Sequence, residues 1–440
     1  MVWVRSVFAG LSSCRNANLL VAKTSSTLGT GNRSIDASPS LASLPPSPSS
    51  IVLAGCGVVG REIARCHVDR KIGFHWIDAD ADALAHAANT WIGDGNSVQA
   101  VPWIDGLFRV EVRNDGSVRT GPPQFGNAPL VIESVVEDAE IKRVLFRKLD
   151  ERFAGTCMLA SNTSTLRIAN LARPPYQDRL VGMHFFMPVT RREGVEVVAH
   201  DGSDPGIRDV VFSHAQRLGK QPFFAPDDAG FIVNRMLSPY LNECLWMACE
   251  GISASTMQKA AHAYGMPMSP FRLIDTIGLE TTLRAGSCYV RAFPNAIEPC
   301  PVITRMVKLG RKAGKMPRIL EHHSDAKSGS TSSPYSDAFS TAAADVFKRY
   351  ARDRPRMSLV EIVERMRLPM RREAAALRDQ HDVGDATIDT AIWGGLAFRR
   401  SPGWTAEERD SDFTVQSRIA ETFGLAMPKP TSRSSNEPKL

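Results

Sequence analysis

The sequence has no apolar run long enough to cross a membrane, because none approaches the roughly 18 residues that a spanning helix needs. Its eight cysteines include no pair with C-x-x-C spacing, and no cysteines and histidines have the spacing of a zinc site. We therefore expect no membrane partner, no metal and no disulfide framework. The cysteines are typical of reduced thiols in an intracellular protein, several of them in a core.

The sequence also has only a small excess of one sign of charge over the other. The 53 lysines and arginines exceed the 47 acids by only 6, and the excess outside residues 1–50 is spread without a basic stripe. Such a distribution predicts no nucleic-acid partner. The 440 residues suggest two or three domains at about 150 residues each, and an apolar content of 43% is enough for sizeable cores.

Three glycines follow an apolar stretch in the spacing G-x-G-x-x-G. Gly55 permits a tight turn, Gly57 keeps side-chain atoms away from a pyrophosphate, and Gly60 lets the next helix pack closely on the strand. That helix begins around Val58 and Val59, and its N-terminus presents N–H groups to the phosphates. The pattern predicts a dinucleotide site, and the alternative is a glycine turn that serves packing alone.

A second apolar stretch, residues 74–77, ends at Asp78, 23 positions after the first glycine. A carboxylate at this distance accepts hydrogen bonds from a ribose diol. It would repel the additional phosphate of NADP. We therefore predict that the cofactor is NAD.

Strand-like and helical patterns alternate up to about residue 228. Strands are expected at residues 130–137, 158–161, 180–186 and 195–198, with a helix at 139–153. The alternation predicts an α/β Rossmann fold with a doubly wound, mainly parallel sheet and ligands at the carboxyl ends of its strands. Ser164 and His184 both fall at such ends.

Helical patterns dominate from residue 229, starting with a helix at 231–251, and they contain a repeat at an offset of 130. Residues 232–239 match 362–369 at five of eight positions, Glu243 matches Glu373, and Gly265 matches Gly395. The repeat predicts two all-α domains related by duplication. The alternative is that two unrelated helices match by chance. The expected division is 1–49 disordered extension, 50–228 NAD-binding domain, 229–323 first helical copy, 324–346 linker, 347–427 second copy and 428–440 disordered tail.

Residues 1–49 are rich in serine, alanine, leucine and proline, which predicts disorder. Four basic residues and a single acid also fit an organelle transit peptide. We favour a cytoplasmic location with an ordinary N-terminal extension. The alternative is the mitochondrial matrix.

Four separate motifs occur in order: Ser-Asn-Thr-Ser at 161–164, Gly-Met-His-Phe-Phe-Met-Pro-Val at 182–189, Glu196, and Asp-Ala-Gly-Phe-Ile-Val-Asn-Arg at 228–235. Together they resemble the L-3-hydroxyacyl-CoA dehydrogenases, over residues of about 50–285 and 359–404. The two helical copies resemble the dehydrogenase half of the multifunctional fatty-acid-oxidation enzymes. The resemblance implies an NAD-dependent oxidation of a 3-hydroxyacyl-CoA.

The resemblance also implies roles for individual residues. His184 would be the base, and Glu196 would orient its imidazole, which suits a side chain that titrates near neutral pH. Ser164 and Asn234 would hydrogen-bond the substrate oxygen and hold His184. Glu137 and Lys142 match positions near the nicotinamide ribose, although Lys142 could equally be a solvated helix residue. Glu364, at the place of Asn234 in the second copy, implies that this copy has no catalytic role.

Three departures separate the sequence from the family pattern. Met187 stands where the family has asparagine, residues 79–128 contain no lysine where the family has a lysine-rich helical pair that grips coenzyme A, and an aromatic ending is missing after Lys315. The alternatives to an acyl-CoA substrate are therefore another 3-hydroxy acid or a non-catalytic NAD-binding regulator. Because two helical copies in one chain could satisfy the contact that pairs subunits in related enzymes, we expect a monomer or weak homo-oligomer.

Overall fold

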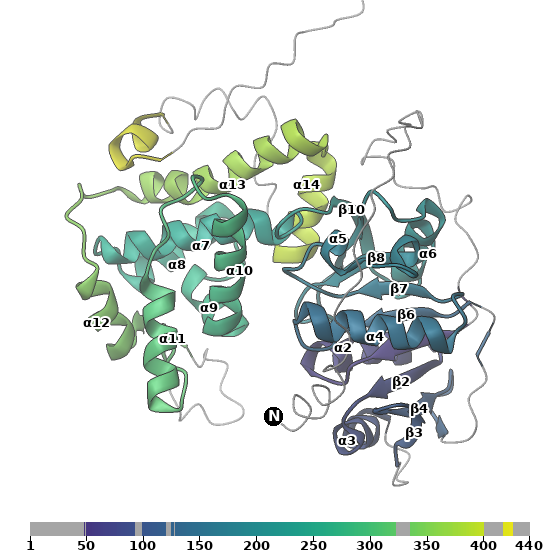
Figure 1. Cartoon of the computed structure of the whole chain (residues 1–440). Coiled ribbons are helices and arrows are strands. Elements are labelled where there is room, and N and C mark those ends of the chain that lie inside the picture. Colours follow the sequence, from purple (N-terminus) through teal and green to yellow (C-terminus); the bar gives the residue numbers. More distant parts are fainter. Residues whose placement is uncertain are drawn as a thin grey trace, which may run out of the picture.

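The computed structural model describes residues 48, 50–92, 99–119, 125–126, 128–322, 335–399 and 417–425. A part built on a large β-sheet lies beside a mainly helical part, and α14 of the helical part lies next to β10 of the sheet (Figure 1). Within these ranges, no helix is both long and apolar enough to span a membrane. Disorder was predicted for residues 1–49 and 428–440, and all of these except residue 48 lie outside the described residues.

The sheet has ten strands in the order β10-β9-β8-β7-β6-β1-β2-β4-β3, with β5 paired to β4. Strands β2, β1, β6, β7 and β8 are mutually parallel. The chain order reverses between β1 and β6, and such a switch point is where a doubly wound sheet binds its ligand. The mainly parallel Rossmann fold is therefore confirmed. The strands are β1 Ile51–Ala54, β2 Phe74–Asp78, β3 Val101–Ile104, β4 Leu107–Val112, β5 Val118–Arg119, β6 Leu130–Glu133, β7 Met158–Ser161, β8 Leu180–Phe185, β9 Gly194–Ala199 and β10 Gln221–Pro226.

Antiparallel strands complete both edges of this sheet. On one edge, β4 pairs antiparallel with β2, β3 and β5, in a region where the sequence departs from the family pattern. On the other edge, β9 pairs antiparallel with β8. The helices of this part are α2 Val58–Asp69, α3 Ala81–Ile92, α4 Ala139–Arg152, α5 Ile168–Leu171 and α6 Pro205–Arg217, with a short 3₁₀ turn at Gln177–Arg179.

The first helix of the helical part begins two residues later than the predicted start at residue 231. Gly230 and Phe231 adopt positive φ angles of 79° and 51°, so a turn precedes α7, which begins at Val233. The helices are α7 Val233–Cys249, α8 Ala254–Tyr264, α9 Pro270–Ile277, α10 Leu279–Ala292, α11 Val302–Ala313, α12 Thr341–Arg349, α13 Leu359–His381 and α14 Asp385–Ala391, followed by a π-helix at Ile392–Leu396 (η4). Residues 417–423 form one further helical segment.

The predicted linker, residues 324–346, is wrong in its second half. Residues 335–339 form strand β12, which pairs antiparallel with β11 (Leu320–His322), and α12 begins at Thr341. Phe339 contacts buried Phe347 of α12 with tilted rings, at 4.7 Å between their centroids, so this segment packs against the helices. The first half of the predicted linker, residues 324–334, lies outside the described residues.

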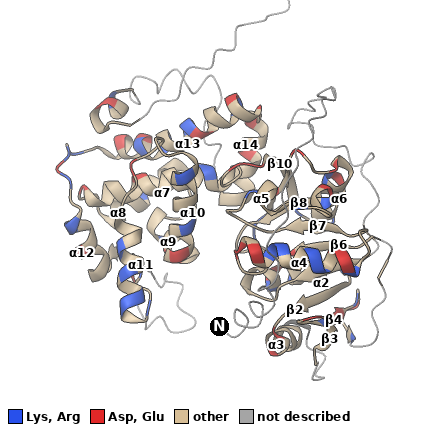
Figure 2. Ribbon diagram, viewed as in Figure 1, with Lys and Arg blue, Asp and Glu red and all other residues tan. Residues whose placement is uncertain are grey.

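The contacts between α7 and α13 are reciprocal at the offset of 130. Arg235 Nε lies 3.0 Å from Glu373 Oε2, and Arg365 Nε lies 2.6 Å from Glu243 Oε1. Each arginine also lies over a phenylalanine at the same offset, Phe293 for Arg235 and Phe423 for Arg365. Charged residues of both signs occur along α13 (Figure 2). Reciprocal pairs are expected of two copies related by an approximate twofold axis, and the duplication itself stays a prediction.

Two buried histidines join α2 to α6. His67 Nδ1 lies 2.8 Å from the carbonyl of Ile63, and its Nε2 lies 3.0 Å from Nε2 of His214. Since a carbonyl only accepts, His67 carries its proton on Nδ1, and its Nε2 accepts from His214. Burial lowers the pKa of His67 from 6.5 to about 4, against the smaller opposing effect of the Ile63 carbonyl. Burial, His67 and Arg217 hold the pKa of His214 well below its ordinary value.

We expect this neutral pair to make the fold acid-sensitive. A histidine whose folded pKa is depressed contributes stability above its unfolded pKa, near 6.5, and this stability is lost as the pH falls toward the folded value. For His67 the loss between pH 7.5 and pH 5 is about 2 kcal/mol. Urea unfolding of His67→Leu at both pH values should show a pH dependence smaller by about that amount. The same dependence in His67→Leu, or a similar reduction in exposed His86→Leu, would contradict the assignment.

Candidate active site

The glycine turn has the geometry that a dinucleotide requires. Gly55 has φ +104°, and a Cβ there would lie 2.5 Å from the carbonyl oxygen of Ser134. A Cβ on Gly60 would lie 2.2 Å from the carbonyl oxygen of Gly55, so α2 packs directly on the turn. A Cβ on Gly57 would meet nothing within 4 Å, which leaves open space where a pyrophosphate can approach the start of α2.

Asp78 lies beside this turn at the carboxyl end of β2. Its Oδ2 accepts a hydrogen bond of 2.7 Å from the backbone N–H of Cys56, and its Oδ1 accepts one of 3.0 Å from Asp80. The Trp76 indole donates to the carbonyl of Gly55 at 3.0 Å and fixes the same turn. The carboxylate is thus held next to the glycines, with lone pairs remaining for a ribose diol.

His184 and Glu196 are direct partners across β8 and β9. Directly opposite residues on neighbouring antiparallel strands have their Cβ atoms about 5 Å apart and share one face. His184 Nδ1 accordingly lies 2.6 Å from Glu196 Oε2, with the imidazole buried and the carboxylate fully enclosed. Because the carboxylate can only accept, Nδ1 carries the proton and Nε2 is the atom able to take one.

The second oxygen of Glu196 is held by the start of α7. Its Oε1 accepts hydrogen bonds of 3.0 Å from the backbone N–H groups of Ile232 and Val233. These groups lie at the N-terminus of a helix of 17 residues, where the partial positive charge stabilises an anion. The positive φ angles of Gly230 and Phe231 turn the chain so that this N-terminus points at Glu196.

Glu137 anchors the loop that follows β7. Its Oε1 accepts hydrogen bonds from the backbone N–H groups of Ser164 and Thr165 and from the hydroxyls of Thr163 and Thr165, at 2.7–3.1 Å. Burial by itself would raise the pKa of Glu137, but the Lys142 ammonium and these hydrogen bonds bring it below its ordinary value. Ser164 is therefore positioned by a carboxylate that stays ionised.

Lys142 is neither solvated nor at the cavity wall. Its side chain is 1% exposed, and its ammonium lies 2.5 Å from Glu133 and 3.4 Å from Glu137. Glu133, which was not predicted, also accepts from the Ser161 hydroxyl at 2.6 Å. In this structure Lys142 positions the two glutamates, and its direct contact with a cofactor stays a prediction. A glutamate at the end of an apolar strand was the available signal for Glu133.

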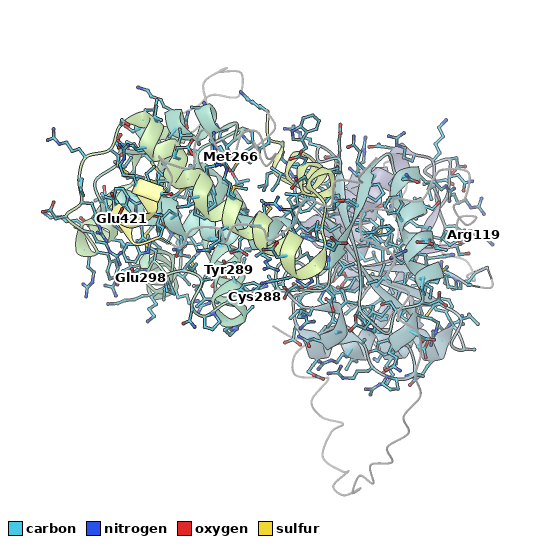
Figure 3. All side chains as sticks on the ribbon, turned by 90° about the horizontal axis from the view of Figure 1, so that it is seen from above. Arg119, Met266, Cys288, Tyr289, Glu298 and Glu421 are labelled. Atoms are coloured by element: carbon cyan, nitrogen blue, oxygen red, sulfur yellow. The ribbon has the colours of Figure 1, made fainter. Side chains whose placement is uncertain are left out.

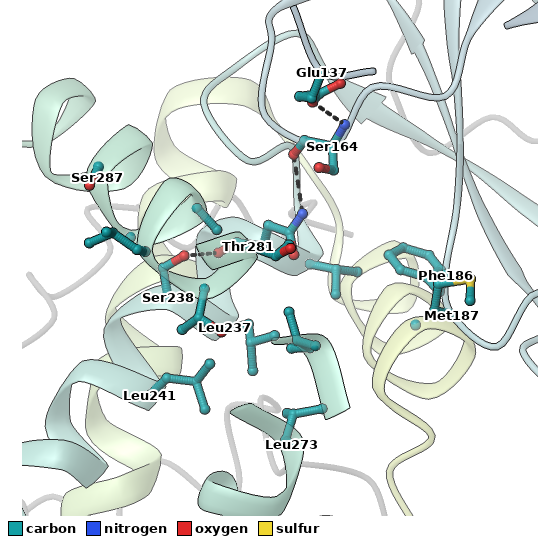
Figure 4. A pocket seen from close by; sticks show the side chains of 18 of the residues that line it. Glu137, Ser164, Phe186, Met187, Leu237, Ser238, Leu241, Leu273, Thr281 and Ser287 are labelled. Atoms are coloured by element: carbon teal, nitrogen blue, oxygen red, sulfur yellow. Dashed lines mark hydrogen bonds between the residues drawn. The ribbon is translucent and has the colours of Figure 1, made fainter. Parts of the chain in front are cut away.

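One cavity of about 800 Å³ joins the glycine turn to the proposed catalytic residues. It is lined by Gly57, Val58, Val59, Glu137, Ser164, His184 and Asn234, among others. Figure 4 shows Ser164 next to Glu137, which accepts a hydrogen bond from the Ser164 N–H. Asn234 Nδ2 donates to the Ser164 carbonyl at 3.2 Å. Eleven of the twelve predicted residues thus lie on or directly beside this cavity or the glycine turn, and Lys142 lies behind it.

Asn162 is a further residue of the site that had no predicted role. Its Oδ1 accepts a 2.8 Å hydrogen bond from the backbone N–H of Phe185, and its Nδ2 donates to the Ser134 hydroxyl at 3.2 Å. It therefore ties the end of β7 to the strand that carries His184. Met187 lies on the cavity wall and is 41% exposed.

The second half of the helical part also reaches the cavity. The π-helix η4 places Gly395 and Leu396 in the cavity wall, and π turns are frequent at functional sites. A Cβ on Gly394 would lie 2.6 Å from Cα of Gly194 in β9, two residues before Glu196. Unlike Gly265, which is left-handed at φ +110°, Gly395 lies within the π turn. Sequence reasoning missed this contact because it depends on an irregular helix.

We expect Gly394→Val to weaken both the fold and the site. The new side chain would have to displace the backbone at Gly194, and such overpacking costs about 1–3 kcal/mol. The melting temperature should fall, and turnover should fall with it because β9 carries Glu196, the partner of His184. Trp393→Ala, at a neighbouring side chain that is 58% exposed, is the matched control and should change stability by less than about 0.5 kcal/mol. Equal effects of the two variants would contradict the importance of the glycine contact.

Contacts of α10 bring the two parts of the chain together over the site. The Cys288 thiol lies 3.2 Å from the carbonyl of Thr165, and Figure 3 places Cys288 and Tyr289 at the boundary between the two parts. In the described ranges, no group of three or more histidine, cysteine or acidic residues is arranged to hold a metal ion. The fold and the site combine a glycine turn of dinucleotide-binding geometry with a buried imidazole–carboxylate pair.

Comparisons with known proteins assign the chain to a family. The family model of the 3-hydroxyacyl-CoA dehydrogenase NAD binding domain matches residues 50–228. The family model of the 3-hydroxyacyl-CoA dehydrogenase C-terminal domain matches residues 230–318. The chain therefore belongs to the 3-hydroxyacyl-CoA dehydrogenase family. The NAD-binding domain of this family and its C-terminal domain therefore follow each other in the chain.

Individual relatives show how far the similarity extends. A fatty acid oxidation complex subunit alpha from Pseudomonas syringae pv. tomato is 28% identical over 316 residues, which are 69% of this chain and 43% of that protein. The chain thus spans less than half the length of this relative. The crystal structure of 3-hydroxybutyryl-CoA dehydrogenase from Escherichia coli shares the fold with a TM-score of 0.63 and 21% identity, over 88% of this chain and 97% of that one. The dehydrogenase part of multifunctional enzyme 1 from C. elegans gives 0.53 and 17%, over 86% of each chain.

Proposed function

We propose that the protein oxidises a 3-hydroxyacyl thioester of coenzyme A to the 3-oxoacyl thioester, reversibly, in fatty-acid β-oxidation. The observation that carries this proposal is the His184–Glu196 pair, which opens into the same cavity as the glycine turn. The oxidation of an alcohol removes a proton from the hydroxyl oxygen and a hydride from the carbon that bears it. The group that accepts the proton and the group that accepts the hydride must therefore lie on either side of that carbon.

His184 Nε2 takes the hydroxyl proton, while NAD, when bound, accepts the hydride. Glu196 keeps the proton on Nδ1 and stabilises the imidazolium that forms, because its carboxylate is fixed by two backbone N–H groups. Asn234 uses one amide proton on the Ser164 carbonyl and has a second for the substrate oxygen. The Ser164 hydroxyl, for which no partner occurs among the described residues, is the other donor to that oxygen.

A second candidate keeps this chemistry and replaces the acyl-CoA by another 3-hydroxy acid. Two observations favour it: Met187 occupies the cavity wall where the family pattern has an asparagine, and the lysine-free region after α3 forms strands β3, β4 and β5. Neither affects the His184–Glu196 pair or the glycine turn.

The test uses the full chain with NADH and acetoacetyl-CoA. Turnover is expected, with NADH strongly preferred to NADPH because of Asp78. Turnover of free 3-oxo acids but not of the thioester would establish the second candidate. Binding of NADH by calorimetry without turnover of either would establish a non-catalytic NAD-binding protein.

We also propose that the chain is a monomer or weak homo-oligomer, because the reciprocal α7–α13 contact satisfies internally what a partner subunit would otherwise supply. Light scattering should give the mass of one chain at micromolar concentration. An obligate dimer held through α7 would overturn this proposal.

A further inference from the structure

The turn that precedes α7, at residues 227–232, is fastened to both parts of the chain by two adjacent aspartates. Asp227 accepts hydrogen bonds of 2.6 and 2.8 Å from two backbone N–H groups at the start of α5, in the sheet part. Asp228 accepts one of 2.7 Å from the N–H of Ala229, within the turn, and lies 3.0 Å from Nε2 of His381, the last residue of α13. Because a carboxylate only accepts, Nε2 of His381 carries a proton and donates this hydrogen bond. The turn is therefore anchored on the sheet part and on the second half of the helical part.

The contact between Asp228 and His381 does not follow from the internal repeat. The offset of 130 places Ser358 and Gly251 at the corresponding positions. Glycine has no side chain to make such a contact, and the Ser358 hydroxyl caps the start of α13 by accepting from the N–H of Glu361. The contact thus belongs to the half of the repeat that holds the proposed catalytic residues and has no equivalent in the other half.

Asp228 also supplies charge to a buried arginine. Arg235 is 1% exposed, and its guanidinium lies 2.9 Å from Asp228 and 3.0 Å from Glu373. Arg365, at the matching position of the repeat, has two glutamates as partners. Gln380 takes the place of the second glutamate and is neutral, so Asp228 provides the missing charge. Burial by itself would raise the pKa of Asp228, but the hydrogen bonds that it accepts and the Arg235 charge bring the pKa below its ordinary value.

We propose that His381 is a positioning residue of the active site, through which the second half of the helical part takes part in the reaction. This inference rests on the proposed dehydrogenase function. His381 holds the side chain of Asp228, and the carbonyl of Asp228 accepts a 3.0 Å hydrogen bond from the N–H of Phe231. The turn shaped in this way presents the two N–H groups at the start of α7 to Glu196, the partner of His184. A displacement of about 1 Å at a catalytic group can lower the rate about 100-fold, so this anchor affects turnover without touching the substrate.

The first measurement is the kcat of His381→Leu with NADH and acetoacetyl-CoA, expressed per NADH-binding site so that unfolded protein does not count. Leucine fills the space but cannot donate to Asp228, so kcat should fall about tenfold. The KM for NADH should change by less than about twofold, because the glycine turn belongs to other elements. His381→Gln retains an N–H donor near the place of Nε2 and should keep kcat within about twofold of the wild type.

Asp379→Asn is the matched control, since Asp379 is exposed on the same turn of α13, and it should change neither kcat nor KM. An unchanged kcat in His381→Leu would overturn the inference and leave His381 with a structural role alone. Equal losses in the leucine and glutamine variants would also overturn it, because the hydrogen bond to Asp228 would then not be the cause.

The second measurement does not depend on turnover. Amide hydrogen exchange in peptides that cover residues 228–236 reports on the N–H groups of Ile232 and Val233, which Glu196 accepts. Exchange there should be at least about tenfold faster in His381→Leu than in the wild type and unchanged in Asp379→Asn. If the wild type turns over and exchange is unchanged in His381→Leu, the inference alone fails. If the wild type binds NADH but reduces no 3-oxoacyl thioester, the proposed function fails and the inference fails with it.

Asp228→Ala removes the other side of the contact and keeps the test valid if His381→Leu does not fold. It should lower kcat at least as much as His381→Leu, because it also leaves Arg235 with a single carboxylate partner. The double variant should have the kcat of Asp228→Ala alone, within about twofold, because the two residues act through one contact. Losses that multiply in the double variant would contradict the proposed path from His381 through Asp228.

Discussion

Replacing His184 by glutamine is expected to lower kcat by about 10³-fold or more while leaving NADH binding intact. Glutamine retains a hydrogen-bonding group of similar length toward Glu196, but it cannot accept the substrate proton at Nε2. A positioned general base typically contributes 10²–10⁴-fold. The effect should be the largest of any single substitution in the cavity, because His184 is the one histidine among the described residues that line it, and its other nitrogen has a fixed carboxylate partner.

The measurements are single-turnover NADH oxidation and NADH affinity by calorimetry. Glu196→Gln provides the matched comparison, since it should lower kcat with a milder effect by disturbing the tautomer of His184 and the two N–H groups of α7. A His184→Gln enzyme with more than about a tenth of wild-type kcat would end the assignment of His184 as the base. Loss of NADH affinity in the variant would instead indicate a structural role.

The resemblance to the family singled out His184 and Glu196, and the regular geometry of strands is what brings the two side chains together. His184 and Glu196 are twelve positions apart on two predicted strands, and the antiparallel register places them opposite each other. The same holds for the glycine turn, where spacing alone determines which glycine meets the strand and which faces a ligand. Regular periodicity thus carries information from sequence to site.

Irregular structure carried much less information. The turn that starts α7 at Val233 depends on a positive φ at Phe231, a residue that gives no such signal. Strand β12 lies in a serine-rich segment that was predicted to be a linker. The π-helix that brings Gly395 to the cavity has no characteristic spacing of apolar residues by which it could be predicted. Lys142 illustrates the related problem of burial, since a lysine on a helix is usually solvated and only tertiary packing encloses it between two glutamates.

Replacing Arg365 by methionine is expected to cost about 3–5 kcal/mol of stability, because it leaves carboxylates buried without a partner. The Arg365 side chain is 3% exposed and bridges Glu243 at 2.6 Å and Glu250 at 3.0 Å between α13 and the end of α7. Burial already raises the pKa of Glu243 despite the opposing effect of Arg365. Without the arginine, Glu243 should bind a proton more readily in the folded state than in the unfolded state.

This linkage gives the prediction a specific signature. When the pKa of a carboxyl group is higher in the folded than in the unfolded state, the protein loses stability as the pH increases. The loss of unfolding free energy caused by Arg365→Met should therefore be smaller at pH 5 than at pH 8. Urea unfolding at both pH values measures it. The control is Arg311→Met, which removes an ion pair between side chains that are 66% and 49% exposed and should cost less than about 1 kcal/mol at either pH. If both variants lost equally little, the reciprocal ion pairs would not hold α7 to α13, and the proposed internal substitute for a subunit interface would lose its physical basis.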